Sequence, residues 1–558
     1  YKTLKGFQVN RKAGWDTHGL PVELGVEKEL GITKEDIGHN ISIEEYNKAC
    51  KKNVMRYKSK WEDLTEEMGY WVDMKAPYVT YDNKYIESVW WLLGKLHKKE
   101  LLYKGHTIQP FSPKAGTGLS THELNQPGCY RNIKDTTIVA QFKVIKNNQS
   151  EFLFNDTKKE VYFLAWTTTP WTLPSNTALA VGAKINYLLV ETKNQYTGKD
   201  ISVIIAKDLA KKYFKPENEK IRFNDYEIGK KELPFRIKSE FKGSLLKDLR
   251  YEQLFQYAKP EKGDAFKVLL ADFVTTEDGT GIVHLAPSFG SDDNRVAKQN
   301  NIGSLTLVNK QGKFVDEVVD FAGMYVKNEF YSNEKDRPKL SADIQIAIKL
   351  KEKNLCFQSE KYEHSYPHCW RTDKPILYYP MDSWFVKTTE YKQKMIELNK
   401  DINWKPKNTG EGRFGKWLEN LVDWNLSRSR FWGIPIPIWR TENNDFEICI
   451  SSIKQLKSEI EKSIKAGLME SNPLAKFNTN SLSEENYSSF DLHRPYVDQI
   501  VLVSKDGRPM KRELDLIDVW FDSGAMPYAQ LHYPFENKEL FTHNFPANFI
   551  AEGVDQTR

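Results

Sequence analysis

The sequence has 558 residues, of which 40% are hydrophobic and 13% aromatic, and 81 basic against 76 acidic side chains give a formal net charge of +5. A chain of this length is too long for one hydrophobic core, so we expect three or more domains, or one domain with large insertions. The mildly basic balance does not by itself indicate nucleic acid, because an RNA-binding protein can carry local basic patches on a near-neutral average.

The cysteines and apolar runs exclude two classes of protein. Five scattered cysteines without a C-x-x-C pair argue against a disulfide framework and favour a reducing compartment. No apolar run approaches a membrane span, and Tyr1 opens no signal-peptide pattern. We therefore expect a cytoplasmic protein without a membrane partner. Because Tyr1 is not an initiator Met and the sequence stops abruptly at Arg558, we also expect an internal part of a longer chain.

Two stretches before residue 100 have the apolar spacing of amphipathic helices. Residues 43–69 and residues 84–98 both place apolar side chains three or four positions apart. We expect both stripes to lie in a core and assign them no chemistry. The stripe of the first stretch consists of Val54, Tyr57, Trp61, Leu64 and Met68.

From residue 136 to residue 330, short runs rich in β-branched and aromatic residues alternate with turn residues. This pattern predicts a mostly β domain inserted between α/β segments. We expect a helix at about 338–353, and we interpret the polar stretch 453–490 as a peripheral insertion or loop. Strand character returns at 498–503 (DQIVLV) and 547–551 (ANFIA).

The first motif that carries chemistry is GWDTHGLPVE, residues 14–23. Two glycines bracket a tight loop that displays the carboxylate of Asp16 and the imidazole of His18. The carboxylate can bind a substrate ammonium, and the imidazole can hydrogen-bond a phosphate or a ribose. The plainer alternative is a turn with polar surface groups.

Two motifs in the β-rich region combine threonines, a histidine and acids. In WTTTPWTLPSN (166–176), adjacent hydroxyls at a strand end can orient a water or grip a ribose, although threonine also simply suits strands. In GTGIVHLAPSFGSDD (279–293), a short strand ends in His284 and a Pro/Gly loop ends in acids. A single histidine on a strand is more often structural, but its pairing with the Thr-rich segment favours a site.

A pair of arginines follows in the string DWNLSRSRFWGIPIPIW, residues 423–439. Arg428 and Arg430 stand two residues apart beside aromatic side chains, an arrangement that suits contact with phosphate or an RNA backbone. The alternative is packing combined with a surface salt bridge.

The last two motifs are DVWFDSG (518–524) and EGVDQTR (552–558). A strand that ends in a polar glycine loop fits the ligand crevice at the carboxyl edge of a parallel sheet. There Glu552 and Asp555 can bind ribose hydroxyls or an ammonium, and Gln556 can both donate and accept.

Taken together, these segments resemble the isoleucine-specific family of class I aminoacyl-tRNA synthetases. The valine and leucine enzymes carry differently worded segments, and they have an Arg where Pro170 stands. The resemblance implies that Asp16 binds the α-ammonium of isoleucine and that Trp520 forms a wall of the side-chain pocket. It also implies that the residues near the nucleotide or the aminoacyl-adenylate are His18, Gly19, Glu552, Gly553, Asp555 and Gln556.

The resemblance further implies an editing site for mischarged valine. A missing methylene changes binding by only about 1–3 kcal/mol, a limit for which isoleucine against valine is the standard example, so a second pocket must hydrolyse the wrong product. Asp293 would hold the ammonium of the wrong amino acid. His284, Thr168 and Thr169 would position substrate or water for ester hydrolysis. A nucleophilic threonine is the less favoured alternative, because no general base stands in a recognisable arrangement with it.

The cofactors implied are ATP and Mg²⁺ for the full-length enzyme. The signatures HIGH and KMSKS, which cradle the ATP phosphates, would lie outside residues 1–558, so we expect this fragment to be competent for editing only. Family members that bind zinc carry cysteine pairs where this chain has residues 112–115 and 369–372. Only Cys369 is a thiol there, and one thiolate cannot build a tetrahedral site, so no zinc is expected.

The implied fold is α/β: a Rossmann-like class I synthetase catalytic domain split by a β-rich editing domain. We assign the catalytic domain to 1–110 and 376–558, with a polar insertion at about 441–490. The editing domain is assigned to 140–335, between connective segments at 111–139 and 336–375. The implied partners are tRNA(Ile), L-isoleucine and ATP, and we expect a monomer.

Three alternatives remain. The first is a valine or leucine enzyme of the same class. The second is an RNA-binding module built on a decayed synthetase, against which the intact Asp16, Glu552, Asp555 and Gln556 argue. The third is a stand-alone hydrolase that uses only the Thr/His/Asp constellation, which leaves the adenylate motifs without a purpose.

Overall fold

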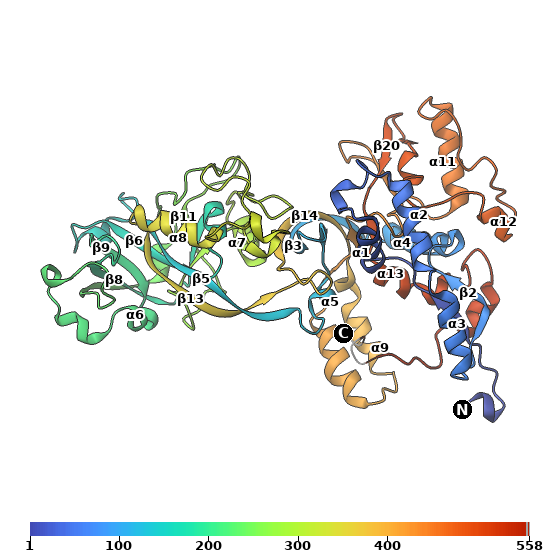
Figure 1. Cartoon of the computed structure of the whole chain (residues 1–558), viewed down its shortest axis with the longest axis horizontal. Helices are drawn as coiled ribbons and strands as arrows, with labels where there is room; N and C mark the ends of the chain where they lie inside the picture. The colour runs from blue at the N-terminus through green and yellow to red at the C-terminus, as the bar shows by residue number, and fades with distance from the viewer. Residues whose placement is uncertain (554–555, 557–558) are drawn as a thin grey trace. The chain divides into compact units, whose positions relative to one another are not determined.

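The computed structural model describes residues 1–553 and residue 556, without the side chains of residues 121 and 122. The chain forms two compact units (Figure 1). Unit 1 consists of Tyr1–Gly105 and Asp382–Arg558, and unit 2 of His106–Met381. Unit 2 is therefore inserted into the sequence of unit 1, and strands β3 (Leu102–Ser112) and β14 (Leu377–Val386) carry the chain between them.

Unit 2 is built on two sheets. A six-stranded sheet has the order β10-β8-β9-β6-β5-β13, and a three-stranded sheet has the order β11-β7-β12. The strands of the first sheet are β5 (Tyr130–Lys143), β6 (Val161–Thr167), β8 (Asn186–Lys193), β9 (Asp200–Ala206), β10 (Phe235–Lys242) and β13 (Cys356–Pro367). Those of the second are β7 (Ala178–Val181), β11 (Lys267–Leu270) and β12 (Ile282–Leu285).

The strand segments predicted between residues 136 and 330 are strands in the structure. β5 and β13 run side by side as a long antiparallel ribbon, from Tyr130 opposite Pro367 to Ala140 opposite Cys356 (Figure 1). The continuous apolar runs of β6, β8 and β9 reflect burial on both faces, because cores lie on each side of the large sheet. The remaining elements of this unit are β4 (Thr117–Gly118), α5 (Thr121–Leu124), α6 (Lys207–Tyr213), α7 (Ser291–Gln299) and α8 (Ala342–Glu352).

Unit 1 combines helices with short strands. Its helices are α1 (Leu20–Leu30), α2 (Ile43–Val54), α3 (Lys58–Glu67), α4 (Asn83–Lys98), α9 (Lys392–Asn399), α10 (Gly415–Glu419), α11 (Ile453–Lys465), α12 (Glu484–Tyr487), α13 (Val519–Gly524), α14 (Met526–Ala529) and α15 (Lys538–Asn544). Its strands are β1 (Lys12–Trp15), β2 (Asp73–Val79), β15 (Trp424–Asn425), β16 (Ser427–Arg428), β17 (Ile438–Arg440), β18 (Glu447–Cys449), β19 (Leu502–Val503), β20 (Pro509–Arg512) and β21 (Leu516–Ile517). β1 and β2 pair in parallel.

The helix predicted at 84–98 forms as α4 and anchors the core of unit 1. Its face of Tyr85, Ile86, Val89, Trp90 and Leu93 is fully buried, because apolar residues at three- and four-residue spacing face the same side of a helix. The helix predicted at about 338–353 forms as α8.

The apolar stripe predicted as core within 43–69 is wrong for its second half. The segment breaks into α2 and α3 near Tyr57, and no residue of α3 is buried. Trp61 exposes 60% of its surface and Met68 70%. Periodicity shows that one face is apolar but not whether another element covers it.

Two other expectations need correction. The stretch 453–490 is not simply a loop, because it begins with α11, whose Ile453, Leu456 and Ile460 lie in the core of unit 1. The segment 547–551 forms no strand, and Phe549 exposes 82% of its surface. A strand needs hydrogen-bonding neighbours, and in the described chain β1 pairs with β2 and with no further strand.

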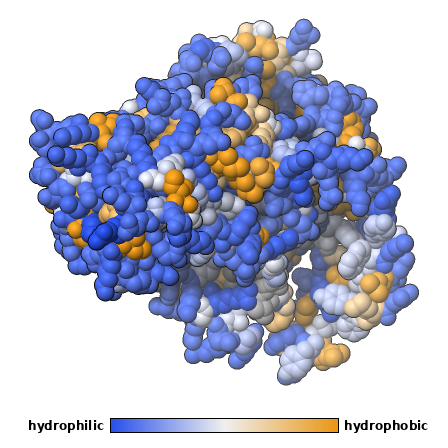
Figure 2. Space-filling view, turned by 60° about the vertical axis from the view of Figure 1, so that its left-hand side comes forward, coloured by the Kyte–Doolittle hydropathy of each residue, from blue (hydrophilic) through white to orange (hydrophobic). Residues whose placement is uncertain are grey.

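The surface agrees with the polar composition. The face shown in Figure 2 is mainly hydrophilic, with apolar side chains in separate groups. Among the described residues, no helix is both long enough and apolar enough to cross a membrane.

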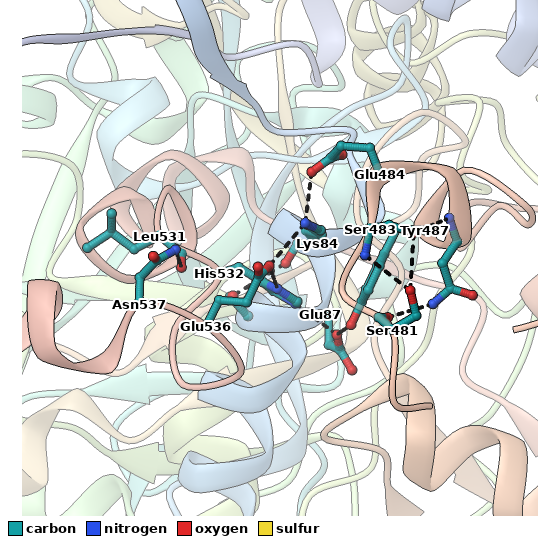
Figure 3. Close-up of polar contacts among 12 residues, drawn as sticks. Lys84, Glu87, Ser481, Ser483, Glu484, Tyr487, Leu531, His532, Glu536 and Asn537 are labelled. Carbon is teal, nitrogen blue, oxygen red and sulfur yellow. Dashed lines mark hydrogen bonds and ion pairs between the residues drawn. The ribbon is translucent and has the colours of Figure 1, made fainter. Parts of the chain in front are cut away.

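A buried carboxylate joins three segments of unit 1. Glu87 on α4 accepts hydrogen bonds from the amide of Ile453 (2.7 Å) and the hydroxyl of Tyr487 (2.9 Å), and it contacts Nε2 of His532 at 2.9 Å. Figure 3 shows the last two contacts, together with the bond from His532 Nδ1 to Glu536 (2.7 Å). Glu87 therefore ties the polar stretch 453–490 and the segment after α14 to the central helix.

We predict that Glu87→Ala lowers the free energy of unfolding by about 3 kcal/mol, because it leaves several buried groups without an acceptor. Urea denaturation followed by tryptophan fluorescence measures this change. The matched control is Glu484→Ala, which removes an exposed carboxylate paired with Lys84 and costs at most about 1 kcal/mol. Equal losses for the two variants would contradict the role assigned to Glu87.

Candidate functional site

The Thr-rich segment of unit 2 turns from strand β6 into a short 3-10 helix, η4 (Pro170–Ser175). Thr167 is buried at the strand end, and its hydroxyl accepts a hydrogen bond from the amide of Thr169 at 3.1 Å. Thr168 is half-buried, and its hydroxyl makes no hydrogen bond within the part of the chain that the structure describes. Thr168 is therefore the threonine of the predicted pair whose hydroxyl is available to a ligand.

A threonine that the sequence analysis did not single out contacts the histidine. Thr172 Oγ1 lies 3.1 Å from His284 Nε2, and the same hydroxyl donates to the carbonyl of Thr169 at 2.8 Å. The hydroxyl has one proton, and a carbonyl can only accept, so Thr172 must accept from His284. Thr172 thus brings the Thr-rich segment and the histidine strand together.

This proton count fixes the state of His284. Burial lowers the pKa of the imidazole to about 4, so the ring is neutral at neutral pH, with its proton on Nε2. The lone pair then lies on Nδ1, which is buried and has no hydrogen-bond partner among the described residues. Such an atom can accept a hydrogen bond from a water or from a ligand hydroxyl.

Asp293 lies in the first turn of α7 and holds the end of the histidine strand. Its Oδ2 accepts a hydrogen bond at 2.9 Å from the amide of Ala286, two residues after His284. Loss of hydration raises the pKa of Asp293 to about 6, so the group is ionised at neutral pH and protonates in mild acid. A Cβ on Gly290 would stand 2.7 Å from the Asp293 carboxyl carbon, so a larger residue at this position would displace that carboxyl group.

Asp343 on α8 supports the Thr-rich segment, and no motif pointed to it. Its Oδ1 accepts the amide of Trp171 at 3.0 Å, at the start of η4. Burial is the main reason that the pKa of Asp343 rises to about 7. Thr172 thus contacts His284, and Asp293 holds the backbone two residues after His284; the roles assigned to Thr168, Thr169, His284 and Asp293 stay predictions.

In unit 1, the loop after β1 presents Asp16 and buries His18. Asp16 is accessible to solvent, yet partial loss of hydration and the Asp522 carboxylate raise its pKa to about 6. His18 Nδ1 lies 2.7 Å from Asp522 Oδ2, and its Nε2 lies 2.9 Å from His493 Nε2. Both ring nitrogens of His18 are therefore engaged, so a contact from this ring to a nucleotide would have to break one of these bonds. Gly19 precedes α1 with φ 118°, a conformation that favours glycine.

Three of the four predicted adenylate-site residues near the C-terminus lie in the described part of the chain. Glu552, Gly553 and Gln556 are exposed, and the strand expected before them does not form. Asp555 lies outside the described residues. Trp520 on α13 keeps 37% of its surface exposed, so one face remains open.

The expected RNA or phosphate contact of Arg428 and Arg430 needs correction. Arg428 is 1% exposed, and its guanidinium pairs with Asp518 at 2.6 Å while it donates to the carbonyl of Ser427. Arg430 is also buried. A surface-bound RNA cannot reach buried side chains. The packing part of the stated alternative describes Arg428, but its ion pair with Asp518 is buried and not at the surface.

The structure does not test the prediction that this chain binds no zinc. Within residues 1–553 and 556, no group of three or more His, Cys, Asp or Glu side chains could hold a metal ion. Cys369 is buried beside Leu119, Leu124 and Ile376, which are not metal ligands. The absence of zinc stays a prediction.

Comparison with known proteins identifies the class. Over residues 1–558 the chain matches the family described as tRNA synthetases class I (I, L, M and V), and it belongs to that family. The mixed α/β content agrees with its catalytic fold.

Within this class, the curated relatives named isoleucine–tRNA ligase are similar over the whole chain. That of Bacteroides fragilis is 60% identical, with 100% of this chain and 51% of the relative covered. That of Clostridium acetobutylicum is 46% identical, with 100% and 47% covered. The chain thus spans about half the length of these relatives. One solved structure, "The crystal structure of GlLeuRS-CP1", is 17% identical and covers 40% of this chain and 99% of its own, but a TM-score of 0.27 is too low to bear on the fold.

We predict that Thr172→Val lowers the free energy of unfolding by about 1–3 kcal/mol, because it leaves the buried Nε2–H of His284 without an acceptor. Thermal unfolding of the 558-residue chain measures the change. ¹⁵N spectra of labelled histidine should also show a loss of the Nε2–H tautomer. The control is Thr177→Val, because the Thr177 hydroxyl is buried with no partner among the described residues. The account fails if Thr177→Val destabilises as much, or if the His284 tautomer does not change.

Proposed function

We propose that this chain is a central part of an isoleucine–tRNA ligase that activates isoleucine with ATP, transfers it to tRNA(Ile) and hydrolyses mischarged Val-tRNA(Ile). The single observation that carries this proposal is identity of 46–60% to isoleucine–tRNA ligases along the whole chain. It is supported by the constellation of Thr168, Thr172, His284 and Asp293 in unit 2.

In this proposal unit 2 contains the editing domain, at 140–335, inserted into a Rossmann-like catalytic domain at 1–110 and 376–558. The Asp293 carboxylate holds the ammonium of the valyl group. Thr168 offers its hydroxyl to the ester or the ribose, and the Thr169 hydroxyl beside it contacts those of Thr167 and Thr172. Water attacks the ester carbonyl, and the bond to the tRNA oxygen breaks to give valine and free tRNA.

His284 orients the water rather than taking its proton. A pKa of about 4 makes the neutral imidazole a weak base, but its free Nδ1 lone pair is a good acceptor within a buried site. The hydrogen bond to Thr172 holds the ring with Nε2 towards the Thr-rich segment, so Nδ1 is the nitrogen left without a partner among the described residues. A nucleophilic threonine is less favoured, because the Thr172 hydroxyl already donates its proton to a backbone carbonyl and no general base among the described residues contacts the Thr168 hydroxyl.

In unit 1, Asp16 binds the ammonium of isoleucine and Trp520 contributes a wall of its side-chain pocket. When ATP and Mg²⁺ are bound in the full-length protein, they supply the α-phosphate that the amino-acid carboxylate attacks. Glu552, Gly553, Asp555 and Gln556 would complete the adenylate site. The role of this chain is then mainly to position the reactants.

We predict that the 558-residue chain deacylates Val-tRNA(Ile) and spares Ile-tRNA(Ile). Asp293→Ala should lower this activity about a hundredfold or more, because the substrate ammonium loses its partner. Release of labelled valine from the tRNA measures the rate. The matched control is Asp292→Ala, whose exposed carboxylate pairs with Arg295. Equal hydrolysis of the two esters by the unmodified chain would refute the editing proposal.

The same site predicts a pH dependence. The pKa of Asp293 is raised to about 6, so the carboxylate needed for the ammonium is lost as the pH falls through that value. His284 keeps its neutral form until the pH approaches 4. We therefore expect kcat/KM for deacylation to fall between pH 7 and pH 5 with a single proton uptake. If kcat/KM did not change with pH in this range, the activity would not depend on the Asp293 carboxylate.

For the synthetic half we predict that the full-length protein has a higher specificity constant for isoleucine than for valine or leucine in ATP–pyrophosphate exchange. Asp16→Asn should raise KM for isoleucine about a hundredfold, through loss of the charge that holds the ammonium. Asp63→Asn, at an exposed position on α3, is the control. A preference for valine or leucine would favour the alternative within the class.

A further inference from the structure

Three buried groups of unit 1, His18, His493 and Asp522, and the half-buried Asp491 form a continuous line of hydrogen bonds beside the Asp16 loop. Asp522 Oδ2 contacts His18 Nδ1 at 2.7 Å, and His18 Nε2 contacts His493 Nε2 at 2.9 Å. His493 Nδ1 contacts Asp491 Oδ1 at 2.6 Å. Both histidines are buried, and the Trp432 ring stacks on His493 at 4.8 Å and 13°.

The number of protons in this line is limited by chemistry. Each of the three contacts needs one proton between its two atoms, and an ionised carboxylate can only accept. If both imidazoles were neutral and both donated from Nδ1, the lone pairs of their two Nε2 atoms would face each other at 2.9 Å, which is unfavourable. The line therefore holds three protons, one of which lies between the two imidazoles.

The surroundings decide where these protons lie. Burial lowers the pKa of His493, so this ring is neutral. The contact of Asp491 with His493 holds the pKa of Asp491 well below its usual range, although partial burial acts in the opposite direction. Neutral His493 then donates from Nδ1 to Asp491 and accepts at Nε2 from His18. The remaining proton lies between His18 and Asp522, whose pKa burial raises.

We propose that His493, held by Asp491, is a positioning residue for the amino-acid site. By accepting Nε2–H of His18 it fixes the ring with Nδ1 towards Asp522, and so sets the loop that presents Asp16. This inference rests on the proposed role of Asp16 in binding the ammonium. His493 lies three residues beyond the stretch 453–490, which was interpreted as a peripheral insertion or loop.

A pair of variants separates the hydrogen bond from the packing. His493→Phe keeps an aromatic ring for the stack on Trp432 but has no acceptor. His493→Gln places a side-chain carbonyl near the former Nε2 and loses the stack. A merely structural role would be preserved better by Phe, and a positioning role by Gln.

The first measurement is ¹⁵N spectroscopy of the 558-residue chain labelled at histidine. We expect a scalar coupling between two imidazole nitrogens across the His18–His493 bond, and a His18 ring protonated at Nε2. In His493→Phe the coupling disappears and the His18 nitrogen shifts change, while His493→Gln keeps the Nε2–H form. Unchanged His18 shifts in His493→Phe, or no coupling in the unmodified chain, would overturn the proposal.

The second measurement is ATP–pyrophosphate exchange by the full-length protein. We expect His493→Phe to raise KM for isoleucine about tenfold, and His493→Gln to stay closer to the unmodified protein. Equal losses for Phe and Gln would contradict the positioning role. If the unmodified protein activates no isoleucine, the proposed function fails, whereas the spectra still test the hydrogen-bond line.

Discussion

A buried imidazole has no water to complete its hydrogen bonds, and this constraint organises both candidate sites. Each ring nitrogen must find a partner in the protein or remain open for a ligand. His18 and His493 satisfy all four of their nitrogens within unit 1. His284 satisfies one through Thr172 and leaves Nδ1 without a partner among the described residues. The first pair is therefore satisfied within the protein, whereas the second ring keeps one nitrogen for which the proposed function supplies a partner.

The supporting groups act by holding backbone in place. Asp343 accepts the amide that begins the turn of the Thr-rich segment, and Asp293 accepts the amide just after the histidine strand. Glu87 performs a comparable task in unit 1 for the start of α11. Asp343 and Glu87 join segments far apart in the sequence, whereas Asp293 closes a loop within its own motif. The geometry of the Thr-rich segment therefore depends on a tertiary bond as well as on its motif.

Much of this architecture follows from local pattern, and the rest does not. The β-rich stretch and the helices at 84–98 and 338–353 were predictable because their periodicity is strong. The buried start of α11 was missed because a polar average hid Ile453, Leu456 and Ile460 at helical spacing. The motifs predicted that His284 and the threonines meet, but the choice of Thr172 depends on a 3-10 turn that sequence does not reveal. The buried ion pair of Arg428 with Asp518, 90 residues away in the sequence, likewise depends on tertiary structure and could not be predicted from the local pattern.

The central claim is that unit 2 binds a mischarged valyl ester. The most direct measurement is a crystal structure of the 558-residue chain with a non-hydrolysable amide analogue of valyl-adenosine. The account predicts that the valyl ammonium lies against Asp293, with the Nδ1 atom of His284 facing the carbonyl carbon through a water. An analogue bound away from these side chains, or bound with His284 Nε2 towards it, would contradict the account.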